Sequence, residues 1–208
     1  MKNLNINRSP FRSFCLSVFA CLISSSAQAG IFNMTRYVAP GQQTAGIEPE
    51  VTMSDGGGFA TNLRYQYGLN QLTNLFGTAG MGGGYRQFRV GGGGTFDLFP
   101  DLDSQPGIGL GTQAFYYRYR GSRGQLEVTA FPYIHKTFVN QGGIEIEPFL
   151  ALPLGPRINS NDTFWGFQMA LGAMVRPDAK SKYNFIGEVG FDISKTENYV
   201  SGGVSFAL

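Results

Sequence analysis

The chain has 208 residues, of which 42% are hydrophobic, 14% are aromatic and only 14% are charged. Average soluble chains carry about 25% charged residues, and the high aromatic content excludes an intrinsically disordered protein. Thirty glycines without a three-residue period exclude a collagen-like chain. No apolar run reaches about 18 residues, which excludes a helical membrane protein.

The first 29 residues have the organisation of an export signal. A basic start is followed by an apolar stretch over residues 14–23 and by the small residues of Ala27-Gln28-Ala29, as in secretory signal peptides. The basic residues are Lys2, Arg8 and Arg12. We therefore expect cleavage after Ala29. Lipid attachment at Cys21 is an alternative, but Phe19 is out of place in the motif that it requires.

Beyond position 29 the chain is close to neutral and contains no cysteine. That part of the chain has thirteen basic and fourteen acidic residues, so its net charge is −1. This charge excludes the basic surface of a nucleic-acid-binding protein. Cys15 and Cys21 both lie within the expected signal peptide, so we expect no disulfide in the exported chain.

From residue 44 onward, apolar and polar residues alternate with a period of two, which predicts β-strands with two different faces. The predicted strands cover residues 44–53, 59–67, 74–81, 85–98, 108–116, 125–135, 144–152, 165–176, 183–193 and 199–208. The faces of the third strand cannot be assigned from the pattern. If the third predicted strand and a neighbouring one do not form separate spans, the number of strands is eight and not ten.

This pattern fits a soluble β-sandwich or a membrane barrel that is apolar outside. A sandwich surface is normally rich in lysine, but only four lysines follow position 29. Strands of about 9–11 residues with aromatic residues near both ends are typical of a barrel. We therefore predict an all-β fold with a single antiparallel transmembrane β-barrel of ten strands, or of eight, over residues 44–208. The signal peptide (1–29) and a periplasmic segment (30–43) precede the barrel.

The last predicted strand runs to the C-terminus as Val200-x-Gly202-x-Val204-x-Phe206-x-Leu208. Together with the signal peptide and the alternating strands, it resembles the small outer-membrane β-barrel proteins of Gram-negative bacteria. The resemblance covers residues 44 to 208. It implies residence in the outer membrane, contact with lipid and lipopolysaccharide, and recognition of the last strand by the barrel-assembly machinery. That machinery usually reads an aromatic last residue, whereas here Leu208 is last and Phe206 precedes it by two.

The sequence lacks the usual arrangements for catalysis or for binding a metal or cofactor. No Lys-Ser or Lys-Thr follows the glycine runs 82–84 and 91–94, so we expect strand bends there and not phosphate loops. His135 is the only histidine, and there is no Gly-x-Ser-x-Gly motif. No histidine or cysteine cluster accompanies the carboxylates. We expect no enzyme, no metal and no cofactor.

Charged residues gather on the predicted inward face. They are Glu48, Glu50, Arg64, Arg89, Glu127, His135, Glu145, Glu147, Arg176, Glu188 and Asp192. A hairpin centred on 55–57 places Glu48 opposite Arg64, and one centred on Gln141 places His135 opposite Glu147. Pairing of this kind lowers the cost of burying charge. The network either lines or gates a pore, or it fills the lumen as static ion pairs, as in many small barrels.

Basic residues also mark the predicted outer turns, where they could hold lipopolysaccharide phosphates or simply be solvated. This outer basic rim comprises Arg86, Arg118, Arg120, Arg123, Arg157 and Lys195. The outer turns are short, so we expect any blockage of the lumen to come from residues of the wall. The expected function is a narrow or side-chain-occluded channel, or a structural component of the envelope. A surface adhesin or lipopolysaccharide-binding barrel is the alternative.

Overall fold

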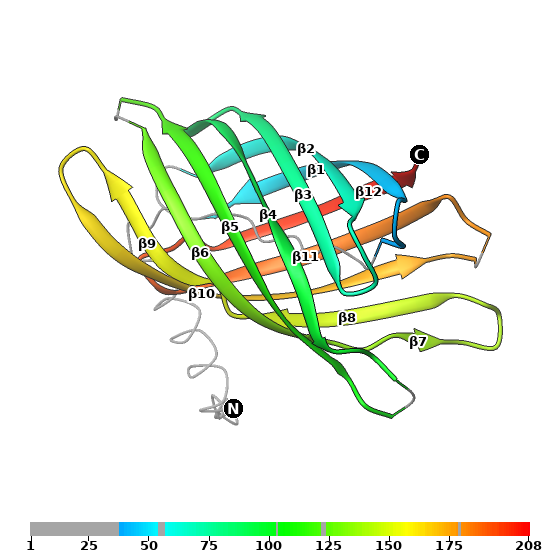
Figure 1. Cartoon of the computed structure of the whole chain (residues 1–208). Helices are drawn as coiled ribbons and strands as arrows, with labels where there is room; N and C mark the ends of the chain where they lie inside the picture. Colours follow the sequence, from blue (N-terminus) through cyan, green and yellow to red (C-terminus); the bar gives the residue numbers. More distant parts are fainter. Residues whose placement is uncertain (1–37, 54–56, 103, 122–123, 179) are drawn as a thin grey trace, which may run out of the picture.

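The computed structural model describes residues 38–53, 57–102, 104–121, 124–178 and 180–208. These residues form a closed antiparallel barrel with ten spans in its wall (Figure 1). The expected signal peptide, residues 1–29, and residues 30–37 of the segment before the barrel lie outside the described residues. No helix in the described part of the chain is long and apolar enough to cross a membrane.

The strands are β1 (Gln43–Thr52), β2 (Gly58–Gly68), β3 (Thr73–Gly82), β4 (Arg86–Phe99), β5 (Gly107–Tyr119), β6 (Gln125–His135), β7 (Phe138–Val139), β8 (Glu145–Ala151), β9 (Leu154–Asn159), β10 (Thr163–Arg176), β11 (Tyr183–Ser194) and β12 (Tyr199–Ala207). Pairing of β1 with β12 closes the barrel. The structure confirms the predicted all-β barrel of ten strands, and the alternative of eight strands is wrong.

β8 and β9 together form one span of the wall. Both pair with β6 on one side and with β10 on the other. The break between them falls at Leu152 and Pro153, because proline has no backbone N–H to contribute to a ladder. β7 pairs with β8 and continues beyond the wall as a short extra strand.

The wall is apolar on its outer surface and polar on its inner surface. Large apolar side chains are exposed on every span, for example Ile47, Leu63, Leu75, Val90, Leu110, Leu126, Ile146, Leu171, Phe185 and Val200. Ionic and amide side chains such as Glu50, Arg89 and Gln168 are buried inside. This is the reverse of a water-soluble protein, and it is the arrangement of a transmembrane barrel.

Inward-facing glycines make room for large side chains on neighbouring strands. A Cβ added to Gly109 would lie 2.2 Å from the Tyr133 ring, and one added to Gly111 would lie 1.9 Å from the Phe131 ring. Residues 91–94 lie within the continuous ladder of β4, where a Cβ on the second or third glycine would collide with backbone oxygens of the adjacent strands. The glycine run therefore allows close approach between neighbouring strands.

The register predicted for the first hairpin is wrong by two residues. Glu48 lies opposite Asn62 and not opposite Arg64. The ladder begins at the pair Thr52 and Gly58, so the connection over residues 53–57 is centred on position 55. A shift of one residue in the centre of a turn changes the cross-strand partner by two.

The register predicted for β6 and β8 is wrong by the same amount in the opposite direction. The partner of His135 is Phe149 and not Glu147. The hairpin from β7 to β8 is centred on position 142, where the side-chain oxygen of Asn140 accepts hydrogen bonds from the backbone N–H groups of residues 142 and 144. A side chain that satisfies the backbone within the turn thus determines the register of this hairpin.

Candidate functional site

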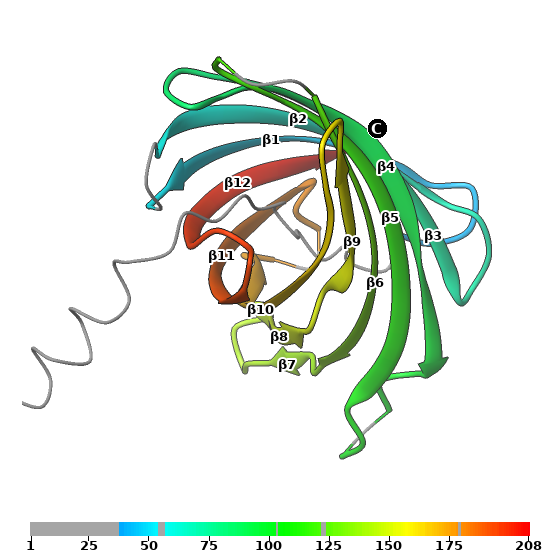
Figure 2. The same cartoon turned by 90° about the vertical axis from the view of Figure 1, so that its left-hand side faces the viewer.

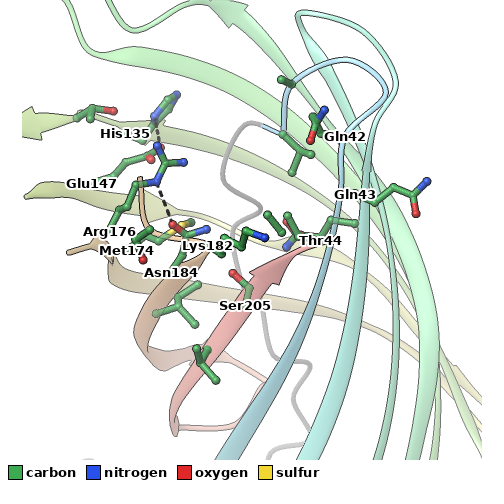
Figure 3. A pocket seen from close by; sticks show the side chains of 18 of the residues that line it. Gln42, Gln43, Thr44, His135, Glu147, Met174, Arg176, Lys182, Asn184 and Ser205 are labelled. Atoms are coloured by element: carbon green, nitrogen blue, oxygen red, sulfur yellow. Dashed lines mark hydrogen bonds and ion pairs between the residues drawn. The ribbon is translucent and has the colours of Figure 1, made fainter. Parts of the chain in front are cut away.

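The two ends of the barrel differ. The end that carries residues 38–42 and Leu208 is called the terminal end, and the opposite end, with the turn over 195–198, is called the distal end (Figure 1). A cavity of about 690 Å³ lies inside the terminal end (Figure 3). Amide and hydroxyl side chains such as Gln42 and Ser205 line it together with charged residues.

A cluster around His135 forms one wall of this cavity. Its Nδ1 lies 2.8 Å from Oε1 of Glu147, and its Nε2 lies 3.8 Å from Oδ1 of Asp97. The hydroxyl of Tyr133 donates a hydrogen bond to the same Asp97 oxygen. His135 and Glu147 are therefore in contact although they are not directly opposite, because diagonal neighbours in a ladder are within reach of long side chains.

Asp101, in the connection between β4 and β5, lies at the mouth of the cavity. Its Oδ1 is 2.5 Å from Nζ of Lys136, and its Oδ2 accepts a hydrogen bond of 2.7 Å from the backbone N–H of Thr137. Burial by itself would raise the pKa of Asp101, but the hydrogen bonds from Lys136 and Thr137 outweigh it. The pKa of Asp101 therefore lies below its ordinary value of 3.8.

Arg176 extends the charged surface of the cavity onto β10. Its Nη1 lies 3.2 Å from Oε2 of Glu145, and its Nε donates a hydrogen bond of 3.3 Å to Oδ1 of Asn184 (Figure 3). These contacts hold the guanidinium against the wall. The cavity is thus a polar space whose charged side chains mostly contact one another.

Ion pairs continue into the middle of the barrel. Nε of Arg64 donates a hydrogen bond of 3.0 Å to Oε1 of Glu48, and both side chains are buried. Asn62 donates a hydrogen bond of 3.1 Å to Oε2 of Glu50, whose other oxygen binds Arg86. Arg64–Glu48 and His135–Glu147, the two pairs that were expected to lie directly opposite, therefore form through diagonal contacts.

Arg89 and Glu188 lie in the same central region without an ion-pair partner among the described residues. Arg89 is 1% exposed, its guanidinium lies 4.8 Å from the centre of the Phe115 ring, and none of its nitrogens has a hydrogen-bond partner in the described part of the chain. Glu188 accepts a hydrogen bond from the hydroxyl of Tyr199.

Aromatic rings occupy the interior beside these charges. Along β5, the rings of Phe115, Tyr117 and Tyr119 follow one another at centroid distances of 6.1 and 6.0 Å. Phe131 and Phe149 are also almost completely buried in the same cluster. Aromatic side chains of the wall therefore occupy part of the interior.

Two residues expected on the outer basic rim lie inside the barrel instead. Arg157 is 2% exposed, and its Nη2 is 3.0 Å from Oε2 of Glu127. Arg86 is buried, binds Glu50, and lies 4.0 Å from Oε2 of Glu197. The prediction that these two arginines form part of an outer rim is wrong, because both stand on strands and face inward.

The remaining rim residues are distributed as follows. Arg118 and Arg120 are exposed at the distal end of β5, and Arg123 lies outside the described residues. The side chain of Lys195 is exposed, with its Nζ 5.6 Å from the centre of the Phe164 ring. Basic side chains at the distal surface are thus fewer than the sequence suggests.

The expectation that only residues of the wall fill the lumen is also wrong. Thr196 and Glu197, in the turn between β11 and β12, are 1% and 4% exposed and lie inside the distal end. A turn of the chain therefore contributes to the filling of the barrel.

Of the eleven residues predicted for the inward network, eight are buried, and Glu145, Arg176 and Asp192 are partly buried. Sequence reasoning missed Arg86, Arg157 and Glu197. For Arg157 a signal exists, because the alternation of residues 144–152 continues in phase through residue 158. For Arg86 none exists, since a bulge between residues 86 and 88 reverses its orientation.

Within the described ranges, no group of three or more histidine, cysteine, aspartate or glutamate side chains is placed to hold a metal ion. No protein-family model and no curated protein matches the sequence.

Two solved structures resemble this barrel. An outer membrane channel from Pseudomonas putida F1 aligns with a TM-score of 0.51 and 9% identity, over 86% of this chain and 100% of the channel. A de novo designed transmembrane β-barrel aligns with a TM-score of 0.39 and 13% identity, over 83% of this chain and 100% of the design. At 9% identity, the similarity to the channel shows a shared fold and not a shared function.

Proposed function

We propose that this protein is an integral outer-membrane β-barrel whose lumen is occluded, so that it serves as a very narrow channel or as a structural component of the envelope. The apolar outer surface supports insertion into a bilayer, because Leu63 and Trp165, among many others, are more than half exposed. In water such a surface would cause aggregation. The fold shared with an outer membrane channel agrees with this placement.

The buried interior is the observation that carries the occlusion. Three ion pairs, Arg64–Glu48, Arg86–Glu50 and Arg157–Glu127, lie inside the barrel beside the aromatic cluster on β5 and β6. The first and the third join adjacent strands, whereas the second joins β4 to β1. Barrels of about eight strands are just wide enough to be filled by side chains, and ten strands add little space. The cavity at the terminal end is then a vestibule without a wide continuation.

Cell fractionation combined with gel electrophoresis tests the placement. We expect the protein in the outer-membrane fraction, with a change of migration in SDS between unheated and boiled samples, because a folded barrel resists SDS. A soluble periplasmic pool, or identical migration of both samples, would contradict the proposal.

Planar-bilayer recording tests the occlusion. The purified barrel should show small current steps or none, whereas large stable steps would identify a general diffusion pore.

Exposed Arg118 and Arg120 also support a second proposal, contact with lipopolysaccharide phosphates at the distal end. Replacing both by glutamine should then weaken binding to lipopolysaccharide without a change in conductance.

A further inference from the structure

The turn between β11 and β12 enters the barrel instead of projecting from it. Figure 2 views the molecule from the distal end, where this orange-red turn joins the two strands. Lys195 begins the turn with a φ of 53°, in the left-handed region, and the next two residues are buried. Backbone in this region is uncommon outside glycine and asparagine, so contacts made by the turn must maintain it.

Buried side chains of the barrel hold the backbone of this turn. Nη1 of Arg157 donates a hydrogen bond of 2.9 Å to the carbonyl oxygen of Lys195, and Nε2 of Gln168 donates one of 2.9 Å to the carbonyl oxygen of Glu197. The hydroxyl of Thr196 lies 2.7 Å from Oδ1 of Asp192. Strands β9, β10 and β11 thus all contact the turn from inside.

The side chain of Glu197 points toward a cation of the opposite wall. Its Oε2 lies 4.0 Å from Nη1 of Arg86 on β4, which also binds Glu50 of β1. Arg157 lies near Glu197 as well, since it binds the carbonyl oxygen of Lys195, two positions before Glu197. The carboxylate therefore lies among buried guanidinium groups, where attraction is much stronger than in water.

We propose that residues 195–197 of the β11–β12 turn are a built-in stopper of the lumen, seated among Arg86, Arg157 and Gln168, and that withdrawal of the stopper opens the distal end to small solutes. This inference rests on the proposed occluded barrel and names the element that controls it. Its seat consists of hydrogen bonds and ion pairs between side chains and a single short turn. Residues 195–197 can therefore leave without breaking the hydrogen-bonded ladder of the wall, while Asn198 stays in place, because its carbonyl oxygen accepts a hydrogen bond of 2.9 Å from the backbone N–H of Met53.

Planar-bilayer recording of two variants tests the stopper. Deleting residues 196 and 197 shortens the turn, and Arg157→Gln removes the cation that holds its backbone. We expect each to raise the single-channel conductance several-fold above that of the unmodified barrel. Arg118→Gln is the matched control, because it removes an exposed charge at the same end of the barrel and lies outside the stopper. Its conductance should be unchanged.

The outcomes separate the stopper from the occluded barrel. If the shortened variant folds, as judged by its shift on heating in SDS, and keeps the original low conductance, the wall alone blocks the lumen and the stopper is refuted. Large steps from the unmodified protein would instead refute the occluded barrel.

Thiol labelling provides a second measurement that does not require the deletion variant to fold. With Cys15 and Cys21 replaced by serine, Thr196→Cys should react with a membrane-impermeant maleimide at least tenfold more slowly than Lys195→Cys. Adding Arg157→Gln should narrow this difference. Equal rates for the two single cysteines would show that the turn is not seated and would overturn the proposal.

Discussion

Buried arginines within this one barrel have different surroundings, and the difference predicts opposite effects of the same substitution. Arg86 contacts Glu50 and Glu197, so its removal leaves two carboxylates in the interior without their cation. Arg89 has no ion-pair partner among the described residues, although it is equally buried. Loss of one partner from a buried pair is strongly destabilising, whereas replacing an unpaired buried charge by an apolar group is not.

We therefore expect Arg86→Met to lower the free energy of unfolding by about 3–5 kcal/mol and Arg89→Met to leave it unchanged or to raise it. Urea titration of both variants in lipid vesicles, followed by tryptophan fluorescence, measures the two values. Equal losses would show that the contact of Arg89 with the Phe115 ring stabilises the barrel as much as an ion pair does.

Asp101 predicts a dependence of stability on pH. Its pKa is depressed in the folded barrel by Lys136 and Thr137, so its contribution is fully present above the ordinary value of 3.8. That contribution is lost as the pH falls through the lower, folded pKa. The difference in unfolding free energy between the unmodified barrel and Asp101→Asn should therefore shrink below about pH 4. A difference that stays constant from pH 3 to pH 7 would contradict this.

At the scale of elements, strand identity follows from a local pattern, whereas register does not. The alternation assigns the inward and outward faces of nine of the ten predicted strands. It does not assign those of the third, because Asn74, Phe76 and Thr78 mix polar and aromatic residues on the inside of β3. The interior of a barrel accepts both kinds of side chain, so chemistry alone does not identify the inward face there.

Pairs of glycine and an aromatic ring on adjacent strands predict the effect of adding a single methyl group. Gly109→Ala should reduce the unfolding free energy by about 1–3 kcal/mol, because the new Cβ would overlap the Tyr133 ring. Gly187→Ala on β11 is the control, since a Cβ there meets nothing within 4 Å. The heat-induced gel shift should move to lower temperature for the first variant alone.

For the whole molecule, closure of the sheet determines how much charge the lumen holds. The described residues include six buried glutamates but only four buried arginines. A lumen with this excess of carboxylates attracts cations, so any residual current should prefer cations over anions. Arg64→Ala should increase the current and strengthen that preference, because it removes one side chain and one positive charge. A reversal potential measured in a potassium chloride gradient gives the preference directly, and an anion-selective variant would contradict it.

The alternation of residues alone predicted the class of fold and the face on which most charged residues lie, and it favoured ten strands over eight. Each of these follows from a period of two along the chain, because successive side chains of a strand point to opposite sides. Even the inward aromatic residues Phe131, Tyr133 and Phe149 follow from this period, and all three are buried.

Register and contacts between distant strands follow only from the closed sheet. His135 and Arg64 do contact Glu147 and Glu48. The residues directly opposite them are others, because a shift of one residue in the centre of a turn moves the opposite residue by two positions. Arg86 faces inward because a bulge reverses it, and it meets Glu197 only because the barrel closes and brings β4 toward the β11–β12 turn. Partners that are far apart along the chain leave no periodic trace in it, since their proximity is created by closure of the sheet and not by any local preference.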